Sequence, residues 1–194
     1  MKDNVWGENT PAKKSGSDGV VVSGNNLFFY TGVTKPNVLT FNKHLLDLDA
    51  KHVAEGTRLG IDPSPIRVRI NSGGGLITAG IAAMDVMKSC VSPIETRIEG
   101  FCASAATFMS VVGSRRVMTR NSFMLIHQLS STFWGKYEEF EDEKKNLDLM
   151  MDMIRSIYRS RASIPASELD SLLKRDLMLT SSRCLEWQLI DEVV

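Results

Sequence analysis

Ser104, His127 and Asp176 have the side chains that together perform acyl transfer. In that chemistry a hydroxyl attacks a carbonyl carbon, an imidazole accepts the hydroxyl proton, and a carboxylate orients the imidazole. The chain has only three histidines, and the other two, His44 and His52, lie in one polar, amphipathic stretch where a solvated helix face is expected. His127, which ends a short apolar run, is therefore the best candidate base. Asp176 precedes a short apolar segment, where a turn or capping role is the alternative.

The residues around Ser104 are small, which would let a substrate carbonyl come close. They separate an extended stretch over residues 94–99 from an apolar, helix-like segment over residues 105–112. The first N–H groups of a helix have no intrahelical partner, and the helix dipole favours negative charge there, so the N–H of Ala105 is a candidate oxyanion donor. Cys102 is an alternative nucleophile, although a buried structural role is more common for a small cysteine.

Three consecutive glycines, Gly73 to Gly75, follow an alternating run over residues 66–70 and precede a helix-like run over residues 76–84. Glycines at a strand-to-helix turn accept positive φ and bring backbone N–H groups close to a ligand. Such a turn offers a second oxyanion donor, unless it serves only the backbone conformation. No Gly-Lys-Ser/Thr sequence follows and no dinucleotide fingerprint is completed, so a nucleotide site is not predicted.

The rest of the chain alternates between strand-like and helix-like segments, the pattern of an α/β fold built from βαβ units. The expected segments are a strand over 27–30, a helix over 38–55, a loop over 56–65, a strand over 66–70, a helix over 76–88, a strand over 94–99 and a helix over 105–112. A longer helix is predicted over 136–161, because apolar residues recur there at helical spacing.

Composition sets broad limits. The 194 residues are 43% hydrophobic, enough for one good core, and 23 basic residues balance 23 acidic ones, so neither nucleic acid nor an anionic membrane is an expected partner. Three cysteines without paired spacing indicate reduced thiols and a cytoplasmic protein. Neither a secretory segment nor a membrane-spanning run is visible. We expect a flexible segment over residues 1–25 and a single domain over residues 26–194.

Taken in order, these motifs resemble the Clp protease family, whose proteolytic subunit (ClpP) is a serine peptidase. Four segments carry the resemblance, which covers residues 26–194: Asn71-Ser72-Gly73-Gly74-Gly75, Gly100-Phe101-Cys102-Ala103-Ser104, Leu125-Ile126-His127-Gln128-Leu129 and Arg175-Asp176. The resemblance implies a ClpP/crotonase-like α/β fold of repeated βαβ units. It also implies that Ser104 is the nucleophile, His127 the base and Asp176 the orienting residue. The N–H groups of Gly75 and Ala105 would form the oxyanion hole, and no cofactor or metal is implied.

The resemblance also implies how the protein would act. Members of the family form homo-oligomers, with heptameric rings stacked as a tetradecamer, and enclose their serine sites in a chamber that admits unfolded polypeptides. A hexameric AAA+ unfoldase commonly supplies those chains. A protruding handle over residues 129–161, made of the helix over 136–161 and a strand over 131–135, would interlock the two rings.

Several positions depart from the family pattern. Arg67 and Arg69 replace aromatic residues that help to form the apolar pocket for docking loops of the unfoldase. They are two residues apart on one strand, so both charges would lie on one face and weaken such docking. Lys174 replaces an acidic residue that helps to pair the rings, and Ser131-Thr132 replaces a Gly-Gly in the handle strand. Such divergence would suit a specialised or virus-encoded member acting in the host cytoplasm.

Three alternatives stand beside an unfoldase-linked serine endopeptidase. The first is a processing peptidase, for example one that matures a capsid, which needs no ATP-driven partner; Arg67 and Arg69 favour it. The second is a non-catalytic subunit that modifies another ring, against which the complete set of Ser104, His127 and Asp176 argues. The third is a crotonase-type acyl-CoA enzyme, which shares the fold and an oxyanion hole but leaves that set unexplained.

Overall fold

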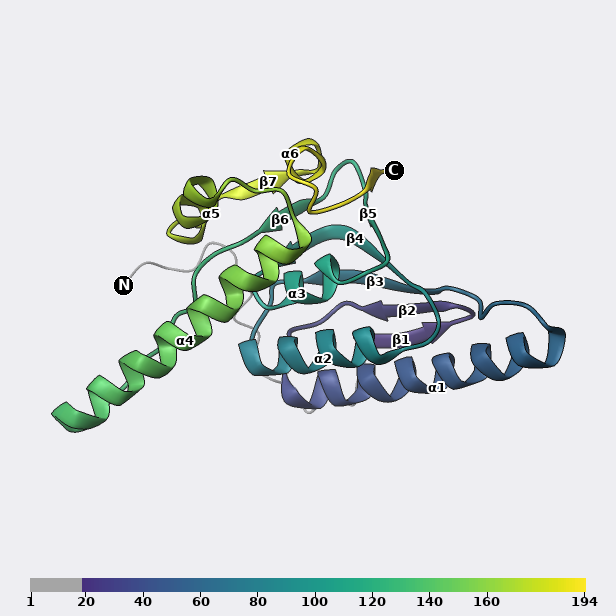
Figure 1. The fold of residues 1–194 in the computed structure, drawn as a ribbon, viewed down its shortest axis with the longest axis horizontal. Coiled ribbons are helices and arrows are strands. Elements are labelled where there is room, and N and C mark those ends of the chain that lie inside the picture. The colour runs from purple at the N-terminus through teal and green to yellow at the C-terminus, as the bar shows by residue number, and fades with distance from the viewer. Residues whose placement is uncertain (1–18) are drawn as a thin grey trace.

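The computed structural model describes residues 19–194, which form one eight-stranded sheet and six helices (Figure 1). In chain order the elements are β1 (Val20–Ser23), β2 (Asn26–Phe29), α1 (Lys35–Leu59), β3 (Ile66–Ser72), α2 (Ile77–Ser89), β4 (Ile94–Ala103), α3 (Ala106–Val111), β5 (Arg115–Met118), β6 (Phe123–Leu125), α4 (Tyr137–Arg161), α5 (Ala166–Leu173), β7 (Met178–Thr180), α6 (Ser181–Glu186) and β8 (Glu192–Val193). The predicted α/β fold class is confirmed.

Five strands run parallel in the order β2-β3-β4-β5-β8, and α1 and α2 pack together along one face of the sheet (Figure 1). β1 pairs antiparallel with β2 at one edge, and Val20 is buried against the core. This strand corrects the last part of the flexible segment predicted over residues 1–25, because pairing with β2 orders the backbone. The first 18 residues of that segment lie outside the described part of the chain.

α1 begins and ends at local signals that fix its length. The Thr34 hydroxyl caps the first turn by accepting a backbone N–H at 3.3 Å, and Pro36 lies in that turn. At the other end Gly60 takes the left-handed conformation, with φ 69°. The helix therefore runs beyond the predicted range of 38–55 and occupies the first residues of the predicted loop.

The prediction for His52 is wrong. This side chain is 2% exposed rather than solvated. Its Nδ1 lies 2.8 Å from Ser64 O and its Nε2 lies 3.2 Å from Asn25 Oδ1. The loop after α1 supplies Ser64 and the turn between β1 and β2 supplies Asn25, so both ring nitrogens contact segments outside the helix. Periodicity within the helix could not predict these contacts.

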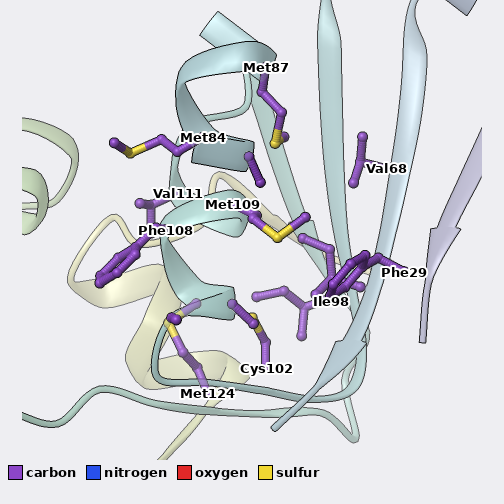
Figure 2. Close-up of a cluster of buried hydrophobic side chains, with 14 of the residues drawn as sticks. Phe29, Val68, Met84, Met87, Ile98, Cys102, Phe108, Met109, Val111 and Met124 are labelled. Carbon is purple, nitrogen blue, oxygen red and sulfur yellow. The ribbon is translucent and has the colours of Figure 1, made fainter. Parts of the chain in front are cut away.

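The core between the sheet and the helices is apolar and closely packed around α3. All six residues of α3 are buried. Figure 2 shows Met109 of this helix among sheet residues that include Phe29 and Ile98, with Cys102 and Met124 in the same cluster. A helix of this length is not stable alone, so burial, which contributes about 1.5–3 kcal/mol for each large apolar side chain, must hold it in place.

β4 changes its hydrogen-bonding partner halfway along. Residues 95–98 pair with β5, whereas residues 101–103 pair with β6. Gly100 lies at the change with φ 73°, a conformation that glycine adopts most readily. Its N–H donates to the hydroxyl of Ser122 at 2.8 Å, and Ser122 is 1% exposed. β6 thereby begins a short branch of the sheet, which β7 completes.

The sheet face opposite α1 and α2 carries a network of ion pairs. Alternate residues of β3 point to that face, so Arg67 and Arg69 share it, with 57% and 29% of their side chains exposed. Arg69 pairs with Glu99, and its guanidinium lies 5.0 Å from the ring centroid of Phe28. The other pairs are Arg67 with Glu95, Arg97 with Glu99, and Arg115 with Glu95 and Glu192.

α4 projects away from the body of the protein (Figure 1). It confirms the helix predicted over 136–161. Trp134 (99% exposed), just before the helix, and Tyr137 (74% exposed), its first residue, both face solvent. The strand predicted over 131–135 is wrong for the single chain, because no strand within residues 19–194 pairs with that segment and a strand needs a hydrogen-bonded neighbour. None of the helices within residues 19–194 is long and apolar enough to cross a membrane.

Replacing Ser122 by alanine should lower the free energy of unfolding by about 1–2 kcal/mol, because the Gly100 N–H and the Thr119 hydroxyl each lose a partner. Denaturant unfolding followed by circular dichroism measures the change. Ser89→Ala is the matched control, since the Ser89 hydroxyl is exposed and bonds only to Val86 O of its own helix. A loss of equal size in the two variants would contradict the role of Ser122.

Candidate active site

The register between β6 and β7 brings His127 opposite Asp176. These strands pair antiparallel, with Phe123 opposite Thr180, Met124 opposite Leu179 and Leu125 opposite Met178. The ladder ends at Leu125 and Met178, and the same register extended two residues beyond it leads to residues 127 and 176. Directly opposed residues in an antiparallel pair have their Cβ atoms about 5 Å apart, close enough for side chains to touch.

The two side chains form a hydrogen bond. His127 Nδ1 lies 2.8 Å from Asp176 Oδ1. An ionised carboxylate can only accept, so Nδ1 carries the proton and Nε2 keeps the lone pair that a base needs. The His127 side chain is 32% exposed and that of Asp176 is 78% exposed, so in the single chain the carboxylate faces solvent.

Ser104 lies one residue beyond β4, on a strand end next to that of β6. Its N–H donates to Leu125 O at 2.9 Å, two residues before His127. Ser104 has φ 53°, in the left-handed region, which costs a residue with a side chain about 1–2 kcal/mol. Strain of this kind persists where the surrounding structure enforces it, and it occurs often at active sites.

The structure thus brings His127 and Asp176 into contact and places Ser104 on the neighbouring strand end. No hydrogen bond within residues 19–194 joins Ser104 Oγ to His127. Such bonds are often long in an unliganded enzyme and tighten when substrate binds. Within residues 19–194 no group of three His, Cys, Asp or Glu side chains is placed to bind a metal ion. His127 and Asp176 therefore do not belong to a candidate metal site there.

Gly74 packs directly against the turn that carries Ser104. A Cβ atom at Gly74 would lie 2.6 Å from both Ala103 O and Ser104 Cβ, and Gly74 has φ 90°. A Cβ atom at Gly75, which has φ 147°, would lie even closer to the carbonyl oxygen of Val33. Close approach and backbone conformation therefore both require glycine at these two positions, and the glycine turn lies beside Ser104.

The N–H groups of Gly75 and Ala105 have no hydrogen-bond partner within residues 19–194. Val33 bonds to Gly74 O and to the Leu76 N–H, in the pattern of a parallel bridge, so the N–H of Gly75 is left over. Ala105 lies between β4 and the first residue of α3. Free N–H groups on both turns beside a serine are what an oxyanion hole requires.

Cys102 is a core residue in this structure. Its side chain is 0% exposed and lies in the apolar cluster of Figure 2. Burial raises the pKa of the Cys102 thiol to about 12. A nucleophilic cysteine needs access and a lowered pKa, so the structure argues against Cys102 as the alternative nucleophile.

Sequence reasoning missed Thr107 and Tyr158. The Thr107 N–H and hydroxyl both donate to Ser104 O, at 2.9 Å and 2.5 Å. Thr107 Oγ1 also lies 2.6 Å from the hydroxyl of Tyr158, which is on α4. The Ser-x-x-Thr spacing before a helix was the one local signal, and nothing near position 107 points to a partner 51 residues away.

Comparison with known proteins agrees with this architecture. A profile of the Clp protease family matches residues 29–194. The chain belongs to the Clp protease family. The ATP-dependent Clp protease proteolytic subunit of Deinococcus radiodurans is 29% identical over 131 residues, which cover 66% of this Clp-family chain and 64% of that protein. The aligned part is therefore less than two thirds of the length of the relative.

Replacing Gly74 by alanine in this Clp-family chain should lower the free energy of unfolding by about 2 kcal/mol or more, because the new Cβ meets the Ser104 turn and the residue must keep positive φ. Gly73→Ala is the matched control, since a Cβ at Gly73 meets no atom within 4 Å and its φ is not positive. Denaturant unfolding of both variants measures the difference. If Gly73→Ala is as damaging as Gly74→Ala, close packing of the two turns is not the cause.

Proposed function

We propose that this chain is a serine endopeptidase that hydrolyses peptide bonds of unfolded polypeptides. The observation that supports it best is the β6/β7 register, which pairs His127 with Asp176 at 2.8 Å next to the strand end that carries Ser104. The free N–H groups of Gly75 and Ala105 add the second requirement for acyl transfer. Membership of the Clp protease family agrees with this activity.

In the proposed mechanism Ser104 Oγ attacks the peptide carbonyl carbon while His127 Nε2 takes the hydroxyl proton. Asp176 holds Nδ1–H and stabilises the imidazolium, and the N–H groups of Gly75 and Ala105 bind the oxyanion of the tetrahedral intermediate. His127 then gives its proton to the leaving amine, which leaves an ester on Ser104. Water, activated by the same imidazole, hydrolyses that ester and regenerates the hydroxyl.

We further propose that the active form is an assembly of copies of this chain, with heptameric rings stacked as a tetradecamer around a chamber. Two surfaces support assembly. α4 projects with exposed aromatic residues (Figure 1), and no helix within residues 19–194 covers the sheet face that carries Arg67 and Arg69, whose side chains are 57% and 29% exposed. Parallel sheets are normally covered on both faces, so a neighbouring molecule is the expected cover. A chamber would restrict cleavage to chains that can enter unfolded.

Ser104→Ala should reduce peptidase activity by about 10³-fold or more, because the nucleophile of such a triad is lost while packing hardly changes. Hydrolysis of a fluorogenic peptide and labelling by a fluorophosphonate probe measure the effect, and native mass spectrometry checks that assembly is unchanged. Cys102→Ala is the control and should keep both activity and labelling.

His127→Ala and Asp176→Asn provide the test that the three residues act as one unit. Adding either to Ser104→Ala should cause little further loss, since residues of one catalytic unit are strongly non-additive. Full activity in Ser104→Ala, or independent losses that multiply, would overturn the assignment.

A processing peptidase without an ATP-driven partner is the second candidate, and the ion pairs on the open face of the sheet favour it. Arg67 and Arg69 stand where the family has aromatic residues for an unfoldase, and both are paired with glutamates. An apolar docking loop would have to displace water from these charges and gain little burial in return.

Arg67→Tyr/Arg69→Tyr should therefore strengthen binding to a Clp-type unfoldase, because buried apolar surface contributes about 25 cal/mol for each Å². A titration of native and doubly substituted protein against a purified AAA+ unfoldase, at equal assembly state, measures the change. Lys51→Tyr on α1 is the control for an added aromatic side chain away from this face. Tight binding by the native protein that the substitution does not improve would remove the main support for the processing peptidase.

A further inference from the structure

We propose that Tyr158 and Thr107 are positioning residues of the oxyanion hole, which hold the N–H of Ala105 in place through the carbonyl of Ser104. The catalytic meaning of this arrangement rests on the proposed function. The arrangement itself is a chain of hydrogen bonds that can be measured without any activity.

The chain of hydrogen bonds has a defined direction. A carbonyl oxygen can only accept, so the Thr107 hydroxyl uses its single proton on Ser104 O, at 2.5 Å. The contact of 2.6 Å between Thr107 and Tyr158 must then be donated by the Tyr158 hydroxyl. The protons therefore run from Tyr158 to Thr107 and from Thr107 to the carbonyl of Ser104.

That carbonyl belongs to the same peptide group as the N–H of Ala105. The peptide group is planar, and its C=O and N–H point in opposite directions. Ser104 O accepts two hydrogen bonds from Thr107, one from its N–H and one from its hydroxyl, so the plane cannot rotate freely. Bonds accepted by the carbonyl also polarise the N–H of the same group and strengthen it as a donor.

The two hydroxyls lie in an otherwise apolar setting. Thr107 is 0% exposed and Tyr158 is 1% exposed, and the Tyr158 ring lies 6.1 Å from that of Phe108. Valine and phenylalanine would fill nearly the same volumes without burying polar atoms. Neither hydroxyl bonds to any further side chain within residues 19–194, so the pair serves the Ser104 turn alone.

The hydroxyl of Tyr158 remains a donor at any working pH. Burial raises the pKa of Tyr158 above its usual value, so the group stays protonated. Ser104 meanwhile holds a strained φ of 53° that needs enforcement from its surroundings. The bond from its N–H to Leu125 O fixes one side of the residue, and the bonds from Thr107 fix the other.

The first test is made on the peptide group itself. Ser-Ala occurs once in the sequence, at residues 104 and 105, so labelling serine with ¹³C at its carbonyl and alanine with ¹⁵N marks this one group in the full-length protein. Tyr158→Phe and Thr107→Val should shift both resonances. Tyr137→Phe, an exposed tyrosine on the same helix, should leave them unchanged. Unchanged resonances in Tyr158→Phe would overturn the proposal.

The second test is kinetic. Thr107→Val should lower kcat for a fluorogenic peptide about tenfold and Tyr158→Phe about threefold, as expected for one lost hydrogen bond acting on the transition state, with KM unchanged. A peptide boronic acid, whose tetrahedral adduct uses the oxyanion hole, should lose affinity by the same factors. Thr107→Ser keeps the donor and should restore kcat, whereas a merely structural role would show as lower thermal stability without this pattern.

The outcomes separate the proposal from the function on which it rests. Active wild-type protein whose kcat and boronic acid affinity are unchanged in both variants would overturn the positioning role. Wild-type protein that neither cleaves peptide nor reacts with a fluorophosphonate would overturn the proposed peptidase activity, and with it the catalytic role of these hydrogen bonds. Shifted resonances in the variants would in that case still support the hydrogen bonds themselves. Parallel losses in kcat and inhibitor affinity, restored by Thr107→Ser, would support the proposal.

Discussion

The change of partner along β4 is the constraint on which the site depends. A strand that paired with β5 along its whole length would leave β6 and β7 nowhere to attach. Because Gly100 bends the backbone and Ser122 takes up the N–H that leaves the ladder, the second half of β4 is free to pair with β6. The register then continues from strand to strand, and it sets where His127 and Asp176 lie relative to Ser104.

The site also depends on two turns that pack more closely than side chains would permit. Gly74 lies against Ser104, whose own backbone is strained. The N–H groups of Gly75 and Ala105, one on each turn, have no hydrogen-bond acceptor within the described residues. Strain of about 1–2 kcal/mol is small beside the burial of α3 directly behind the turn. The core thus holds a conformation that the local sequence would not keep by itself.

The surfaces outside the site are unusual for a sheet of parallel strands. One face is covered by α1 and α2, and the other carries arginines and glutamates in mutual contact. The glutamates are only 15% exposed, whereas the arginines reach solvent, so these charges present a polar surface and affect which partners can bind. Arg67 and Arg69, with glutamates opposite them, make the face unsuited to an apolar segment. By contrast, the exposed aromatic residues that begin at Phe133 are suited to contact with an apolar partner.

The sequence by itself determined the α/β class, most of the helices and strands, the family and the candidate residues Ser104, His127 and Asp176, because each depends on local signals: periodicity, glycines at turns and short motifs. The catalytic roles of those three residues remain predictions. Only the tertiary structure showed that His52 is buried, that residues 131–135 have no pairing strand among residues 19–194, and that Tyr158 reaches the turn of Ser104. Each of these results depends on segments far apart in the chain meeting in space, and hydrophobic periodicity within one segment carries no information about what will pack against it.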